Sequence, residues 1–167
     1  MNELFAPAKR EAIFSHDKAY RYWLSIAWDD QIPAVNFLML NPSIATAERN
    51  DPTVERCERR ARQLGFGGLI VTNLFALVST DPKALKAHPD PIGPANNVHI
   101  LEAARQTRLT VCAWGQHGRL MNRAEEVIYR LSYSDFLLYY LKLSKDGIPC
   151  HPLYLGYDLK PKLWSLP

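Results

Sequence analysis

The clearest hydrophobic pattern in the chain is an apolar run over 35–40, interrupted only by Asn36, which stops abruptly at Asn41-Pro42-Ser43. A run of this length bounded by a turn signal is typical of a buried strand. The proline favours the turn, because it keeps the residue before it out of the helical region. The pattern predicts a core strand with Asn41 at its carboxyl end, where open α/β sheets bind ligands. The alternative is that Asn41 only caps the strand and begins the turn.

Two further stretches, 12–16 and 19–28, lie on either side of the short polar segment Asp17-Lys18. Tyr20, Tyr22, Leu24 and Ile26 alternate with their neighbours at a period of two. Alternation of this kind around a short polar loop predicts an N-terminal β-hairpin.

Strand patterns alternate with helical ones over the rest of the chain. Strands are predicted at 69–73, 109–114 and 136–143, and helices at 51–65, 81–87, 95–106 and 119–132. No clear element is expected in the tail from Leu153. Because strands that alternate with helices imply right-handed crossovers and a parallel sheet, we predict an α/β fold. It would be a single three-layer α/β/α domain over 1–167, with four parallel strands extended by the hairpin.

Composition and charge exclude several classes of protein. The chain has 167 residues, of which 47% are hydrophobic, as is ordinary for a globular domain. No run reaches the roughly 18–20 apolar residues of a membrane span, and the N-terminus lacks the pattern of a signal peptide. Three widely spaced cysteines indicate neither a disulfide framework nor a zinc site. We therefore expect a reduced cytoplasmic protein, and its net charge of +3 permits nucleic acid as a partner without requiring it.

Polar side chains follow each predicted parallel strand, so they would gather at one rim of the sheet. They are Asn41, Ser43, Asn73, Gln116, His117, Lys145, Asp146 and His151. Such groups suit the orientation of a neutral ligand. The chain has no glycine-rich phosphate loop and no serine in a nucleophile elbow. Its histidines lack metal-ligand spacing, so neither a metal nor a cofactor is expected.

Five blocks of residues, spread over roughly 35–157, carry a resemblance to a known family. The blocks are Leu40-Asn41-Pro42-Ser43, Asn50-Asp51-Pro52-Thr53, Asn73-Leu74-Phe75-Ala76, Ala113-Trp114-Gly115, and Lys145-Asp146-Gly147 followed by His151-Pro152-Leu153-Tyr154-Leu155. They resemble the 1643 family of domains of unknown function, and that name implies no activity.

The order of the motifs is also similar, more distantly, to the uracil-DNA glycosylase superfamily, especially its mismatch-specific branch. That resemblance implies a four-stranded parallel sheet between helices. Its first strand ends in a polar residue that positions the attacking water, and Asn41 matches it. A second strand can end in an asparagine that reads the base edge, and Asn73 matches. A third ends in Trp-Gly, as at Trp114. The final His-Pro motif implies an electrophilic role for His151 and a wedge into the duplex for Leu155.

Several features depart from that superfamily. Leu153 replaces a serine that contacts the DNA backbone, and Asn41 replaces the aspartate of the fastest branch, which suggests a slow or differently selective enzyme. The long polar loop 43–50 would admit a modified base. Phe75 and Tyr154 are the candidates for the aromatic residue that stacks on the base.

The resemblance implies a monofunctional DNA glycosylase that hydrolyses the N-glycosidic bond of a damaged or modified base. An enzyme of this kind extrudes the base into a pocket, and this one would need no metal or cofactor. The implied residues are catalytic Asn41 and His151, substrate-binding Ser43, Asn73, Phe75, Gln116 and Tyr154, and DNA-binding Lys145 and Leu155.

Two alternative functions remain open. One is a hydrolase or transferase for a nucleoside-like small molecule on the same fold, which a pocket rim without net positive charge would favour. The other is a non-catalytic nucleic-acid-binding module. Individual residues have structural alternatives as well: Asn73 would satisfy loop backbone, and His151 and Trp114 would pack in the core. The arginines at 56, 59, 60 and 62 would form a solvated helix face or contact phosphates.

Overall fold

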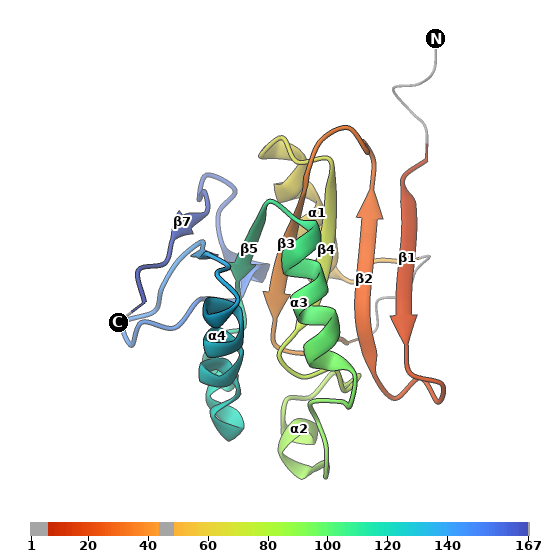
Figure 1. The fold of residues 1–167 in the computed structure, drawn as a ribbon, viewed down its shortest axis with the longest axis vertical. Helices are drawn as coiled ribbons and strands as arrows, with labels where there is room; N and C mark the ends of the chain where they lie inside the picture. Colours follow the sequence, from red (N-terminus) through yellow and green to blue (C-terminus); the bar gives the residue numbers. More distant parts are fainter. Residues whose placement is uncertain (1–6, 44–48, 167) are drawn as a thin grey trace.

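The computed structural model describes residues 7–43 and 49–166, which build one sheet in the order β1-β2-β4-β3-β5-β6-β7 (Figure 1). Its strands are β1 (Lys9–Phe14), β2 (Arg21–Ala27), β3 (Ala34–Met39), β4 (Gly68–Asn73), β5 (Leu109–Cys112), β6 (Leu138–Tyr140) and β7 (Lys162–Leu163). Strands β4, β3, β5 and β6 are parallel, and β1 and β2 form a hairpin whose second strand runs antiparallel to β4. The predicted four-stranded parallel sheet with an N-terminal hairpin is confirmed.

Helices α1 (Pro52–Gln63), α3 (Asn96–Gln106) and α4 (Arg123–Tyr133) cover the two faces of this sheet, and α2 (Lys83–Ala87) lies beyond its end (Figure 1). The chain also forms the 3-10 turns η2 (Gln116–Asn122) and η3 (Pro152–Tyr154). Alternation along β3 explains the layers, because successive side chains point to opposite faces. Phe37 packs in one core with Val54 and Cys57 of α1. Leu38 packs in the other core, with residues of α3 and α4.

Several elements differ from the sequence prediction. Helix α4 begins at Arg123 rather than 119, because the backbone of Met121 and Asn122 is left-handed there (φ 58° and 53°). Strand β6 is shorter than predicted. The tail from Leu153 contains η3 and the two-residue β7, which pairs antiparallel with β6. An exposed strand of two residues is too short to show alternation, so the sequence carried no signal for it.

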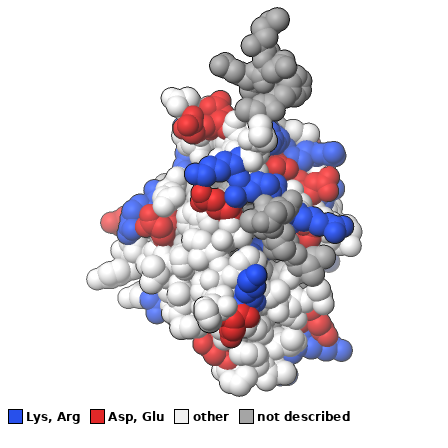
Figure 2. Space-filling model, turned by 90° about the vertical axis from the view of Figure 1, so that its right-hand side faces the viewer, with Lys and Arg blue, Asp and Glu red and all other residues white. Residues whose placement is uncertain are grey.

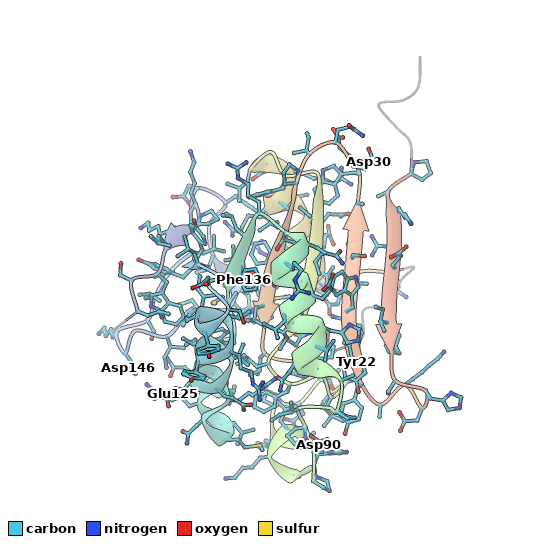
Figure 3. The ribbon with its side chains drawn as sticks, in the orientation of Figure 1. Tyr22, Asp30, Asp90, Glu125, Phe136 and Asp146 are labelled. Atoms are coloured by element: carbon cyan, nitrogen blue, oxygen red, sulfur yellow. The ribbon has the colours of Figure 1, made fainter. Side chains whose placement is uncertain are left out.

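The sheet has two distinct ends. Figure 3 labels Asp30, in the loop between β2 and β3, at one end, and Asp90, which follows α2, at the other. The second end is where β3 and its parallel neighbours finish, and the loops that follow them lie there. Within the described residues, no helix combines the length and the apolar character needed to cross a membrane.

Candidate functional site

A cavity of about 470 Å³ opens at the carboxyl ends of β3, β4 and β5. Six of the eight polar residues that the sequence predicted for the rim line this cavity together, although they come from four separate segments. They are Asn41, Ser43, Asn73, Gln116, His117 and His151. The predicted rim of the parallel sheet therefore corresponds to a concave surface, the usual setting of a small-molecule site.

Asn41 is held by its amide nitrogen. Its Nδ2 donates to the carbonyl oxygens of Pro42 (3.1 Å), Leu77 (3.4 Å) and Ser79 (2.9 Å). Three acceptors on one side fix which end of the amide is nitrogen, so Oδ1 is directed away from them as an acceptor. Asn41 thus fastens the loop that follows β4, and it also lines the cavity.

His151 caps η3 with its imidazole. The Nδ1 atom accepts a hydrogen bond from the backbone N–H of Leu153 at 3.3 Å, so in the neutral ring the proton resides on Nε2. Water reaches this ring, but the surrounding protein desolvates it and lowers the pKa of His151, while the negative charge of Asp51 acts in the opposite direction. In its neutral form the ring therefore carries an Nε2–H donor.

Asn73 contributes a buried polar group to the cavity lining. The residue is 2% exposed, and its Nδ2 is buried with no hydrogen-bond partner within the described part of the chain. Its backbone is firmly held, because the Nδ2 of Asn96 donates to the carbonyls of Asn73 (2.9 Å) and Leu74 (3.0 Å). An unsatisfied buried donor costs about 1–3 kcal/mol and calls for an explanation. A ligand with an acceptor atom would satisfy it.

Two charged residues of the cavity were missed as site residues. Arg21 of β2 is 2% exposed and lines the cavity. Burial lowers the pKa of Arg21 to about 10, against the opposing charge of Asp51, so the guanidinium stays protonated at neutral pH. Asp51 was predicted only as the α1 cap, which it is, since Oδ1 accepts from the N–H of Val54 at 2.8 Å. Its Oδ2 also accepts from Ser43 Oγ at 2.6 Å.

The comparisons with known proteins bear on this set of residues. A family model described as "Protein of unknown function (DUF1643)" matches residues 21–153. The chain belongs to this family. The match covers every cavity residue named above and confirms the resemblance predicted from the five sequence blocks. No curated protein and no solved structure matches the chain.

Other predicted residues of this DUF1643 chain lie outside the cavity. Phe75 is fully buried in the core with α3 and α4, and Tyr154 is 91% exposed beside Leu155 in a separate groove. Neither side chain lines the cavity, so neither is placed to stack on a base bound in it. Trp114, expected to pack in the core, is 3% exposed and is the one aromatic residue among the described cavity lining. Lys145 is exposed in the turn after β6, away from the cavity lining.

The arginines of α1 correct another expectation. Arg60 is 1% exposed and donates to the carbonyls of Leu155, Gly156 and Leu159. Arg56 donates to the Leu155 carbonyl as well and lies over the Tyr157 ring. The predicted solvated face is therefore wrong for these two side chains, which hold the tail that follows His151. Leu155 itself packs partly against the core and lines a separate groove outside the cavity.

Most of the long polar loop expected to admit a modified base, residues 44–48, lies outside the described residues. Across the part of the chain that is described, no group of three His, Cys, Asp or Glu side chains is placed to hold a metal ion.

Proposed function

We propose that this chain hydrolyses the N-glycosidic bond of a nucleobase bound in the cavity, acting as a DNA glycosylase on a damaged or modified base. The observation that carries the proposal is that Asn41, Asn73 and His151 line a single cavity. These are the three residues for which the motif order implies water positioning, base reading and leaving-group stabilisation.

The chemistry follows from the groups present. Cleavage of an N-glycosidic bond passes through an oxocarbenium-like state and leaves negative charge on the departing base. The Nε2–H of His151 would donate to that charge, and a neutral donor held in place before the reaction stabilises it without reorganisation. The Oδ1 of Asn41 would orient the attacking water, and the unpartnered Nδ2 of Asn73 would bind an acceptor on the base edge.

A free nucleoside is the second candidate substrate, and the charge of the cavity favours it. Among the described lining residues the only Lys or Arg is Arg21, and it is buried. Figure 2, which faces the β1 edge, shows basic and acidic side chains intermixed, in keeping with the pairs Lys9–Glu11 and Arg62–Glu58. DNA binding normally relies on several cations at phosphate positions. Lys145 would supply one such contact in the DNA case.

The test uses two substrate panels. Single- and double-stranded labelled oligonucleotides carrying uracil, mismatches and modified bases are incubated with the protein, and abasic sites are cleaved with alkali. Free nucleosides are incubated in parallel, and released base is separated by chromatography. We expect release in one panel and a loss of about 10²–10³-fold in His151→Ala, the usual cost of one preorganised donor. Asn41→Ala should also lose activity, whereas Thr80→Ala, an exposed hydroxyl position on the same lining, should not.

Each result assigns the function differently. Release from oligonucleotides supports the glycosylase, and release from nucleosides alone supports the small-molecule hydrolase. A folded protein that binds oligonucleotides, releases no base and binds equally well after Asn41→Ala would be a non-catalytic nucleic-acid-binding module. Absence of both binding and release would contradict the proposal altogether.

A further inference from the structure

The proposed hydrolysis leaves one proton without a destination. The attacking water must lose a proton as its oxygen bonds to the sugar carbon, and the amide of Asn41 orients water but is not a base. A carboxylate is suited to general-base work. Among the described residues that line the cavity, Asp51 is the only carboxylate.

The geometry around Asp51 links it to the water-positioning residue. Ser43, two residues after Asn41, donates its hydroxyl proton to Asp51 Oδ2 at 2.6 Å, a length typical of an O–H···O⁻ bond to a charged oxygen. The other carboxylate oxygen accepts the Val54 N–H at the start of α1, which fixes the orientation of the carboxylate. Asp51 is 7% exposed, and both it and Ser43 lie on the cavity lining.

An independent observation marks the same cavity as a ligand site. The buried Nδ2 of Asn73, at the end of β4, lacks a partner in the described chain. Asp51, at the beginning of α1, therefore lines the same cavity as a residue whose buried donor lacks a partner within the described chain. The other charged or titratable groups of the lining are Arg21 from β2, His117 from η2 and His151 before η3.

We propose that Ser43 and Asp51 form a proton relay in which Asp51 is the general base for the water oriented by Asn41. This inference rests on the proposed function. The water oxygen bonds to the sugar carbon while the carbon–nitrogen bond breaks, and the bonding electron pair leaves with the base. The proton of the water moves to Ser43 Oγ as the Ser43 proton moves to Asp51 Oδ2. The products are the hydrolysed sugar, the base anion held by His151, and protonated Asp51, which returns its proton to solvent or to the base.

The alternative is that Asp51 serves only as the helix cap, and Asp51→Asn separates the two roles. Asparagine caps helices about as well as aspartate and keeps its shape, but it cannot accept the proton. The relay predicts that kcat falls about 10²–10⁴-fold, the usual contribution of a general base, with KM and the melting temperature little changed.

Variants of Ser43 provide a test that leaves the cap untouched. Ser43→Ala should lose most of the activity, and Ser43→Thr, which restores a hydroxyl, should recover it. Thr80→Ala is the matched control, because it removes a different hydroxyl of the same lining. These two Ser43 variants decide the question if Asp51→Asn lowers the melting temperature.

The failures of the two proposals are distinguishable. Wild-type turnover in Asp51→Asn or Ser43→Ala, together with loss in Asn41→Ala, would overturn the relay and leave the hydrolase in place. A wild-type protein that releases no base from either substrate panel would overturn both.

Discussion

The single residue on which the proposed chemistry depends most is His151. Because its Nδ1 accepts the Leu153 N–H, we expect nitrogen NMR to find the neutral ring protonated on Nε2. Desolvation should place the pKa of this ring below its ordinary value of about 6.5. Asp51→Asn should lower that pKa further, since the charge of Asp51 favours the protonated form. A ring protonated on Nδ1, or a pKa that rises in Asp51→Asn, would contradict this account.

A second histidine allows a test of stability against pH. Burial lowers the pKa of His99, whose ring stacks on Tyr22 with centroids 5.2 Å apart. Between its folded and unfolded pKa values the unfolded chain binds more protons, so the free energy of unfolding increases with pH there. It should therefore be lower in urea denaturation at about pH 5.5 than at about pH 7.5. His99→Gln should reduce this difference, whereas His16→Gln, on the exposed hairpin loop, should leave it unchanged.

At the scale of elements, buried side-chain donors from α3 and α4 hold the backbone at the end of β4 and so position Asn73. Arg123, at the start of α4, is fully buried and donates from Nε to the Leu74 carbonyl at 2.7 Å. It also pairs with Glu126, as does Arg130, whose side chain is 46% exposed. Arg123→Lys should lower the free energy of unfolding by about 1–3 kcal/mol, because an ammonium cannot reproduce these bonds. Arg130→Lys should change it by less than about 0.5 kcal/mol. Equal effects in urea denaturation would contradict this assignment.

Elements with a clear hydrophobic pattern or start signal in the sequence were predictable, whereas elements that depend on tertiary contacts were not. The apolar runs of β3 and β4 and the Asp-Pro start of α1 determine these elements locally. The kink before α4 depends on left-handed backbone at Met121 and Asn122, for which neither residue gives a clear signal. Strand β7 is defined only by its antiparallel pairing with β6, which is a tertiary contact.

The same distinction applies to the site. Residues at the ends of parallel strands, such as Asn41 and Asn73, were predictable because the topology brings those ends together. Arg21 was not, since it reaches the cavity only because β2 pairs antiparallel beside β4. The alternation in β2 indicates a face of the sheet but not which neighbour lies next to it. Trp114 packs in the core as expected. Tyr154, a candidate to stack on the base, is instead exposed outside the cavity, because the position of the tail depends on its tertiary contacts.

At the scale of the whole molecule, the end of the sheet opposite the cavity is closed by backbone contacts around Gly67. The carbonyl of Gly67 accepts from the N–H groups of Trp28 and Asp29, and its own N–H donates to Pro33. A Cβ added to Gly67 would collide with the backbone oxygens of Asp29 and Ile32. These atoms belong to the β2–β3 loop, which cannot move aside without breaking the same hydrogen bonds.

Gly67→Ala should therefore lower the stability of the fold without changing the properties of the cavity. We expect the free energy of unfolding to fall by about 1–3 kcal/mol or more, as for other overpacked positions. Gly65→Ala, where φ is 85° but nothing lies within 4 Å, should cost only the left-handed strain of about 1–2 kcal/mol. Because Gly67 lies at the far end of the parallel strands, the pKa of His151 and the turnover per folded molecule should stay unchanged. A shift of the His151 pKa in Gly67→Ala, measured by NMR on the folded fraction, would show that the two ends of the sheet are coupled.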